Sequence, residues 1–201
     1  GKSTLLNLLN KKSFPVKGSI KSEVNTFYFP YTQLIKDQNT FKIIKENIAP
    51  FEEWEKRMGD LSISGDEKSI IAFGEILEKY EDAKGYEIDS MIEKEFAELN
   101  MDKELLNRNL NTLSGGEQTR ALLIPLFLKK NSFPLIDEPT DHLDMKGRII
   151  VGEYLSKKNG FIIVSHDRNL LDRCTDHTLS INKSDVRLSK GNYSQWKYNM
   201  E

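Results

Sequence analysis

The sequence predicts an α/β core that carries an inserted helical lobe. Two short apolar runs, 133–136 and 161–164, each end in polar residues, as buried parallel strands do at their carboxyl ends. Between residues 36 and 108 the pattern changes to dense charge, few glycines and apolar residues at helical spacing. A length of 201 residues suits one domain, or one domain with an inserted lobe, and is enough to bury a core.

The composition argues against several classes of protein. The formal net charge of -2 gives no global basic field for nucleic acid, which leaves only a local basic patch open. The single cysteine, Cys174, cannot form an internal disulfide and fits a reducing compartment, where we expect a packed side chain. No apolar run reaches the roughly 20 residues of a membrane span. We therefore expect a cytoplasmic protein without membrane insertion.

The first elements follow directly from residue spacing. Four leucines within residues 5–9 predict a helix that starts at the opening Gly1–Thr4. Residues 17–20 predict a turn into a strand, and the aromatic run 26–31 predicts a strand that ends at its proline.

The inserted lobe shows one clear apolar stripe at helical spacing: Ile88, Ile92, Phe96 and Leu99. Charged residues of the same segment lie mainly off this stripe and are expected to face solvent: Glu93, Lys94, Glu95 and Glu98. Phe51 and Trp54 are expected to be packing residues of the lobe.

From residue 109 onward helices and strands alternate again. Helices are expected at 119–128 and 147–157, and strands at 133–136 and 161–164. A terminal hairpin is expected from 177–182 and 186–188. Pro134 removes one ladder donor from its strand, so we expect a local irregularity there.

The opening residues match the end of a phosphate-binding loop, G-x-x-x-x-G-K-[S/T]. Backbone N–H groups and partial positive charge at a helix amino terminus suit phosphate. We expect Gly1 to belong to this loop and Lys2 to reach the β- and γ-phosphates. The Ser3 hydroxyl would ligate Mg²⁺ and Thr4 would help seat the α-phosphate. Four residues alone are weak evidence, so the remaining motifs decide.

Two further motifs fit a nucleotide site. Asp137 and Glu138 follow an apolar strand, where Asp137 is expected to hold Mg²⁺ and Glu138 to activate water as general base. The hexapeptide 113–118, which reads LSGGEQ, precedes an expected helix. Ser114 can cap that helix, and its glycines let a phosphate approach the backbone. A lone S-G-G is equally well explained as a simple turn. Here the whole hexapeptide is followed by the acidic strand end Asp137–Glu138, which favours a nucleotide site.

The hexapeptide resembles the signature motif of ATP-binding cassette (ABC) ATPases: Ser114, Gly115, Gly116, Glu117 and Gln118. Residues 1–4 resemble the end of the family's Walker A loop, Asp137–Glu138 its Walker B pair, and His166 its catalytic switch histidine. The resemblance implies a P-loop cassette fold that binds ATP and Mg²⁺. In this family two cassettes sandwich two ATP molecules, so Ser114 and Gly116 would contact the ATP of a partner cassette.

Residues 138–144 resemble the E-P-T-N-H-L-D run of the ABC-F class, soluble twin-cassette proteins that act on ribosomes. Asp144 matches the D-loop aspartate, and 191–194 resemble the stretch that closes the first ABC-F cassette. The chain is thus interpreted as a first cassette cut at both ends, without the start of Walker A, so this fragment should bind ATP poorly. The expected core comprises residues 1–35 and 109–190. Residues 36–108 are expected to form a helical arm, and residues 191–201 the start of a linker.

Two positions depart from the ABC-F pattern. Asp141 stands where the family usually has asparagine, which adds negative charge near the site. Tyr31 stands at the position of the Q-loop glutamine, with Gln33 two residues later. A similar aromatic stretch occurs in antibiotic-resistance ABC-F proteins, which favours ribosomal protection over a housekeeping role in translation.

The leading hypothesis is therefore an ABC-F ATPase whose partners are a second cassette of the same full-length chain and the ribosome with its rRNA. The ATPase subunit of a membrane transporter and an ATP-sensing cassette without turnover stay open as alternatives. The sequence argues against a Ser-His-Asp hydrolase, because the consecutive residues 165–167 cannot easily supply the geometry of a triad.

Overall fold

The computed structural model describes residues 1–31, 37–182 and 185–200. Contacts within the chain divide it into two units. Unit 1 comprises Gly1–Gln33, Gly115–Arg120 and Asn131–Glu201, and unit 2 comprises Leu34–Ser114 and Ala121–Lys130. Unit 1 contains a parallel sheet with helices, whereas the described part of unit 2 is built from helices. The predicted limits of core, arm and linker stay a prediction.

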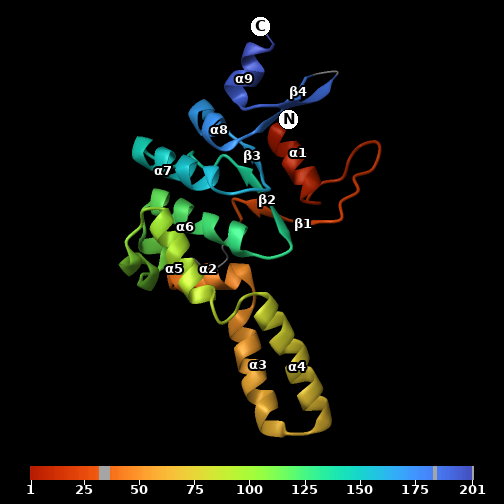
Figure 1. Cartoon of the computed structure of the whole chain (residues 1–201), viewed down its shortest axis with the longest axis vertical. Helices are drawn as coiled ribbons and strands as arrows, with labels where there is room; N and C mark the ends of the chain where they lie inside the picture. The colour runs from red at the N-terminus through yellow and green to blue at the C-terminus, as the bar shows by residue number, and fades with distance from the viewer. Residues whose placement is uncertain (32–36, 183–184, 201) are drawn as a thin grey trace. The chain divides into compact units, whose positions relative to one another are not determined.

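Unit 1 is built on three parallel strands in the order β1–β2–β3 (Figure 1). Their bounds are β1 (Asn25–Phe29), β2 (Ser132–Asp137) and β3 (Ile162–Val164). Phe29 pairs with Ile136, and Asp137 pairs with Val164. Because the strands are parallel, their carboxyl ends lie at one edge of the sheet, where sites of this fold class form.

The central strand β2 is the most buried of the three, with Leu135 and Ile136 only 1% and 0% exposed. The predicted irregularity at Pro134 is wrong, because the β1–β2 register is continuous through the pair Phe27 and Pro134. The β2–β3 ladder begins only at Leu135. Pro134 therefore has a paired neighbour on one side alone, which makes a missing N–H easier to tolerate.

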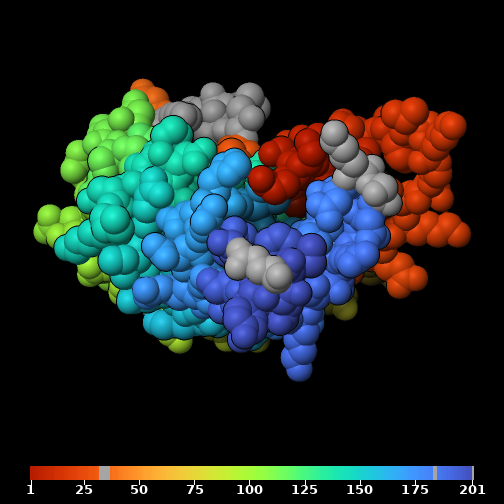
Figure 2. All heavy atoms as spheres, turned by 90° about the horizontal axis from the view of Figure 1, so that it is seen from above, coloured from red at the N-terminus to blue at the C-terminus, as the bar shows by residue number. Residues whose placement is uncertain are grey.

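The segment between α1 (Lys2–Leu9) and β1 differs from the prediction. Gly18 has a φ of +84°, as a turn glycine can, but no strand follows it before Asn25. Phe14 and Val16 are 90% and 99% exposed, so this loop has no packed face that would hold a strand. In Figure 2 the loop, in orange-red, projects from the rest of unit 1.

Helix α7 (Met145–Ser156) lies between β2 and β3 in the chain. Strand β3 is followed by α8 (Arg168–Cys174), by a hairpin of β4 (His177–Ile181) and β5 (Val186–Lys190), and by α9 (Tyr193–Tyr198). The predicted hairpin is present as an antiparallel pair, and part of its turn, 183–184, lies outside the described residues. α7 packs against α8 and buries Val151 and Leu155. Burial raises the pKa of the Cys174 thiol to about 12, which suits the expected packed, unreactive side chain.

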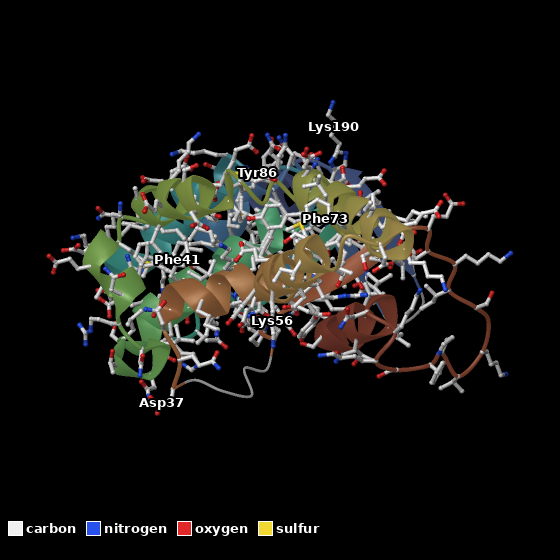
Figure 3. The ribbon with its side chains drawn as sticks, turned by 90° about the horizontal axis from the view of Figure 1, so that it is seen from below. Asp37, Phe41, Lys56, Phe73, Tyr86 and Lys190 are labelled. Atoms are coloured by element: carbon white, nitrogen blue, oxygen red, sulfur yellow. The ribbon has the colours of Figure 1, made fainter. Side chains whose placement is uncertain are left out.

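The named elements in the described part of unit 2 are helices. Its helices are α2 (Thr40–Ile48), α3 (Phe51–Ser64), α4 (Glu67–Asp82) and α5 (Ile88–Glu98), with short 3₁₀ turns at Lys103–Asn107 and Leu110–Thr112. Helix α6 (Gly115–Leu128) begins in unit 1 and continues into unit 2. Helices α3 and α4 pack side by side as a hairpin (Figure 1). In Figure 3, α3 is found by its labelled residue Lys56 and α4 by its labelled residue Phe73. No described helix is long and apolar enough to cross a bilayer.

The predicted apolar stripe of unit 2 is buried, with Ile88, Ile92 and Leu99 all 0% exposed. Phe51 is also fully buried and meets the Trp54 ring edge-on at a centroid distance of 5.8 Å, so both residues pack as expected. The prediction that Glu95 faces solvent is wrong, because its side chain is buried, with 9% exposure. Helix α5 contacts both α2 and the first 3₁₀ turn, so its buried face is wider than the apolar stripe.

Candidate active site at the carboxyl edge of the sheet

A pocket of about 310 Å³ lies within unit 1 and gathers several predicted site residues. Its lining comes from α1, from β1 and the residue after it, from the first turns of α6, and from the end of β2 and the chain after it: Ser3, Tyr28, Phe29, Pro30, Thr119, Asp137, Glu138, Pro139, Asp141 and His142. Ser3, Asp137 and Glu138 thus share one pocket. Asp141 adds its carboxylate to the same lining, in line with the expected extra negative charge.

Helix α1 brings Ser3 to this pocket, whereas Gly1, Lys2 and Thr4 do not line it. Lys2 is its first residue, with Gly1 as N-cap, so backbone N–H groups of the first turn stay unpaired within the helix. Lys2 and Ser3 are exposed. Anions are favoured at such a terminus by its free donors and its partial positive charge.

Asp137 ends β2 with two carboxylate oxygens in different surroundings. The Tyr28 hydroxyl donates a hydrogen bond of 2.7 Å to Oδ2. Oδ1 is buried and has no hydrogen-bond partner among the described residues. Burial and then the bond to Asp137 raise the pKa of Tyr28 to about 12, so the phenol is a protonated donor at neutral pH.

An unpartnered buried carboxylate oxygen is costly unless a cation or another donor compensates it. Mg²⁺ prefers oxygen ligands and commonly uses one or two protein groups together with substrate phosphates. Asp137 Oδ1 and the Ser3 hydroxyl fit that pattern. Among the described residues, no three or more His, Cys, Asp or Glu side chains are grouped so that they could hold a metal ion by themselves, so most remaining ligands would have to come from phosphate and water.

Glu138 leaves the strand in a left-handed backbone conformation, with a φ of +47°. Neighbouring residues of an extended strand point to opposite faces. The left-handed turn breaks that alternation, which explains how Asp137 and Glu138 line the same pocket. A non-glycine residue with positive φ carries some strain, and such residues cluster at functional sites.

The Glu138 carboxylate is held by the chain after β3. Its Oε2 accepts hydrogen bonds from the His166 backbone N–H at 3.0 Å and from the Ser165 hydroxyl at 3.2 Å. Its Oε1 lies 3.4 Å from His166 Nε2. The backbone N–H of Glu138 also donates to the Val164 carbonyl at 2.9 Å. The carboxylate is therefore fixed in orientation, as a general base requires.

His166 lies beside this carboxylate but does not line the pocket. Its side chain is 81% exposed, so the ring can reach a ligand only from the rim. Ser165 accepts from the Asp167 backbone N–H, and Asp167 accepts from Leu170 at the start of α8. These described bonds tie Ser165 and Asp167 to Glu138 and to α8, which gives a hydrolase triad no support.

The signature residues open helix α6 directly after Ser114. A side chain at Gly116 would approach Leu143 Cδ2 to 3.2 Å, and one at Gly115 would meet His142 at 4.0 Å. The glycines thus allow α6 to begin close to the chain after β2. Ser114 and Gly115 are exposed, while Gly116, Glu117 and Gln118 are half-buried.

Asp144 has a clear structural role at the start of α7. Its Oδ1 accepts the Gly147 backbone N–H at 2.7 Å, which caps the helix. A Cβ at Gly147 would lie 2.9 Å from that oxygen, so the close approach requires glycine. Arg148 then donates to the Leu143 carbonyl and to Asp167, which joins the chain after β2 to the start of α8.

Replacing Asp144 by alanine is expected to lower the free energy of unfolding by about 1 kcal/mol, because α7 loses its cap. Asp144→Asn keeps an acceptor oxygen and loses only the charge, so it should retain most of that stability. Urea denaturation of the purified full-length protein measures both variants. Equal losses in the two would contradict the capping role.

Sequence reasoning missed two residues of this site. The sequence places Tyr28 in an aromatic stretch and Ser165 in a disfavoured triad, but they bond the carboxylates of Asp137 and Glu138. The signal for Ser165 was its place at the end of a strand beside His166. Tyr31 lies just after β1, and burial raises its pKa. The expectation about Gln33 falls outside the described residues.

A family model described as "ABC transporter" matches residues 1–141. The chain belongs to the ABC transporter family. The solved structure "Dimeric Structure of MJ0796, a Bacterial ABC Transporter Cassette" has the same fold, with a TM-score of 0.60 at 19% identity over 94% of this chain and 80% of that one. The predicted α/β cassette fold is thereby confirmed.

Curated relatives of this ABC chain span nearly all of it at low identity. The Bacillus subtilis "Uncharacterized ABC transporter ATP-binding protein YfmM" is 28% identical over 98% of the chain and 40% of its own length. The Streptomyces fradiae "Tylosin resistance ATP-binding protein TlrC" is 28% identical over 90% and 35%. The Mycobacterium tuberculosis "Energy-dependent translational throttle protein EttA" is 28% identical over 79% and 30%.

These relatives include ABC-F members, which confirms the predicted resemblance. The predicted class of enzyme, an ATPase domain of the ABC type, is confirmed as well. The chain spans 40% or less of the length of the three relatives named above. What the whole protein acts on is therefore a matter of inference from the site and from its relatives.

Proposed function

We propose that the full-length protein is an ABC-F ATPase that binds and hydrolyses ATP and acts on the ribosome. The observation that carries the proposal is the fixed Glu138 carboxylate in the same pocket as Asp137 and Ser3. A general base needs an oriented carboxylate within reach of a substrate site, and this pocket supplies both.

Each predicted site residue takes one role in this proposal, and three of them, Ser3, Asp137 and Glu138, line the pocket. Lys2 and the first turn of α1 hold the phosphates of ATP, to which Gly1 and Thr4 contribute. Ser3 and Asp137 hold Mg²⁺, which would neutralise charge on the transferred phosphoryl group. Glu138 orients and deprotonates the attacking water.

His166 completes the catalytic group in this proposal. Its exposed ring beside Glu138 Oε1 would contact the γ-phosphate. The Ser165 hydroxyl and the His166 backbone N–H keep the Glu138 carboxylate turned toward the pocket.

The composite site needs a second cassette, which we place in the same full-length chain. Ser114 and Gly115 are exposed at the start of α6, where they are accessible to a partner. Backbone N–H groups at a helix amino terminus suit the γ-phosphate of the partner's ATP. The solved relative with this fold is described as a dimeric cassette, which supports the pairing.

The ribosome is the partner that the relatives favour. EttA is named a translational throttle and TlrC a tylosin resistance protein. We propose that this chain belongs to the same functional group, located with ribosomes in the cytoplasm. The aromatic residues 28–31, similar to those of resistance ABC-F proteins, favour ribosomal protection against antibiotics. In this proposal 36–108 form the arm and 191–201 begin the linker toward the second cassette.

The test is ribosome co-sedimentation of the full-length protein that carries Glu138→Gln and the equivalent change in its second cassette. With ATP the closed state should persist, so the protein should sediment with ribosomes. With ADP it should stay in the supernatant. Absence of sedimentation with both nucleotides would contradict the ribosome proposal and favour the ATPase subunit of a transporter.

A further inference from the structure

The two oxygens of the Asp137 carboxylate differ in a way that the roles above do not explain. Asp137 is 9% exposed and lies at the pocket. Oδ2 accepts the Tyr28 hydroxyl at 2.7 Å, whereas Oδ1 is buried without a partner among the described residues. One oxygen is thus engaged by a neighbouring strand, and the other is left for a ligand.

Tyr28 is placed for this contact by the sheet. It belongs to β1 and pairs with Leu135 of β2, two residues before Asp137. From there its phenol reaches along the strand direction to the end of β2. The ring also lines the pocket, and Lys12 Nζ lies 4.7 Å from its centroid. The contact joins residues that are far apart in sequence, so it depends on the parallel sheet.

The hydrogen bond has a directional consequence for the carboxylate. A phenol O–H that donates to an ionised carboxylate forms a charge-assisted bond, which is stronger than a neutral one. Such a bond fixes the rotation of the carboxylate about its Cβ–Cγ axis. Because Oδ2 is held, Oδ1 takes a single position relative to Ser3 and the pocket.

We propose that Tyr28 is a positioning residue for the metal: its hydroxyl holds Asp137 so that Oδ1 faces the Mg²⁺ of bound Mg–ATP. This inference rests on the proposed ATP site and deepens it. In this proposal Tyr28 acts on the metal through Asp137 rather than through contact with phosphate or water. Its removal should therefore weaken the contribution of the metal to ATP binding without changing the affinity of the site for metal-free ATP.

The test compares wild type with Tyr28→Phe in the full-length protein, with a fluorescent ATP analogue titrated in EDTA and in excess Mg²⁺. The ratio of the two dissociation constants gives the metal enhancement of binding. We expect Tyr28→Phe to reduce this enhancement by about tenfold, since a hydrogen bond to a charged group is lost. The dissociation constant in EDTA should stay within twofold of wild type.

Tyr80→Phe is the matched control. The Tyr80 hydroxyl donates to Glu55 at 2.9 Å in unit 2, so this variant loses the same kind of tyrosine–carboxylate bond outside the pocket. It should keep the metal enhancement of wild type. Thermal melting of both variants without ligand shows whether each one folds.

A double-mutant cycle with Asp137→Asn separates positioning from a general structural effect. If Tyr28 acts through Asp137, adding Tyr28→Phe to Asp137→Asn should reduce the enhancement no further. Additive losses would overturn the proposal, and so would an unchanged enhancement in Tyr28→Phe.

If wild type itself shows no metal enhancement, the proposed ATP site fails together with this inference. If wild type and Tyr28→Phe show the same metal enhancement, the role of Tyr28 is wrong but the proposed ATP site is not contradicted.

Discussion

Glu138→Gln is expected to lower the rate of ATP hydrolysis by about 10²- to 10⁴-fold, which is the usual contribution of a general base. Glutamine has nearly the shape of glutamate, so its side-chain oxygen can still accept from Ser165 and His166 as Glu138 Oε2 does. What it loses is the ability to take a proton from water. ATP binding should therefore change by only a few-fold.

Measuring turnover and ATP affinity in the same preparation checks this prediction. The full-length protein should carry the equivalent change in its second cassette, so that the second site does not mask the effect. Glu153→Gln is a suitable control, because it removes a carboxylate of unit 1 that makes an exposed ion pair with Arg173. That variant should hydrolyse ATP at the wild-type rate. Wild-type turnover in Glu138→Gln would exclude Glu138 as the base.

Lys2→Ala is expected to weaken ATP binding by about 10- to 100-fold, because a charge-assisted contact with the phosphates is lost. Lys2 is exposed at the first position of α1, and its ammonium can add a point charge to the helix terminus. The folding of the chain should be little affected. Isothermal titration with ATP and Mg²⁺ gives the affinity directly.

The control for Lys2→Ala is Lys17→Ala, which removes one exposed positive charge from the loop after α1. It changes the net charge by the same amount but leaves the helix terminus intact. Only a local contact of Lys2 with phosphate predicts different affinities for the two variants. If both variants bind ATP with the same affinity, Lys2 contributes to binding only through the net charge and not through a contact with phosphate.

Much of the fold could be predicted because local signals agree with the tertiary structure. The runs that became β2 and β3 carry apolar residues followed by polar ones, and the stripe of α5 repeats at helical spacing. The burial of Glu95 could not be predicted in this way. It depends on which elements surround α5, and that information is not contained in its own periodicity.

The candidate site was predicted in part. Ser3, Asp137 and Glu138 follow from motifs, since each motif states which chemistry its residues can perform. The contact of Tyr28 with Asp137 could not be read from spacing, because it requires the register of β1 against β2. The left-handed conformation of Glu138 was likewise invisible, because glutamate has no special preference for it.

The hydrogen bonds that join Glu138 to β3 and to the residues after it affect how the site can lose its geometry. Both its backbone N–H and its carboxylate bond to the chain at or just after a three-residue strand in which no residue is buried. Segments with few buried apolar contacts open locally at a lower free energy than whole domains. Fraying of β3 alone would release the carboxylate while β1, β2 and α1 stay folded. The arrangement around Glu138 would thus have a local stability of its own, below that of the unit which carries it.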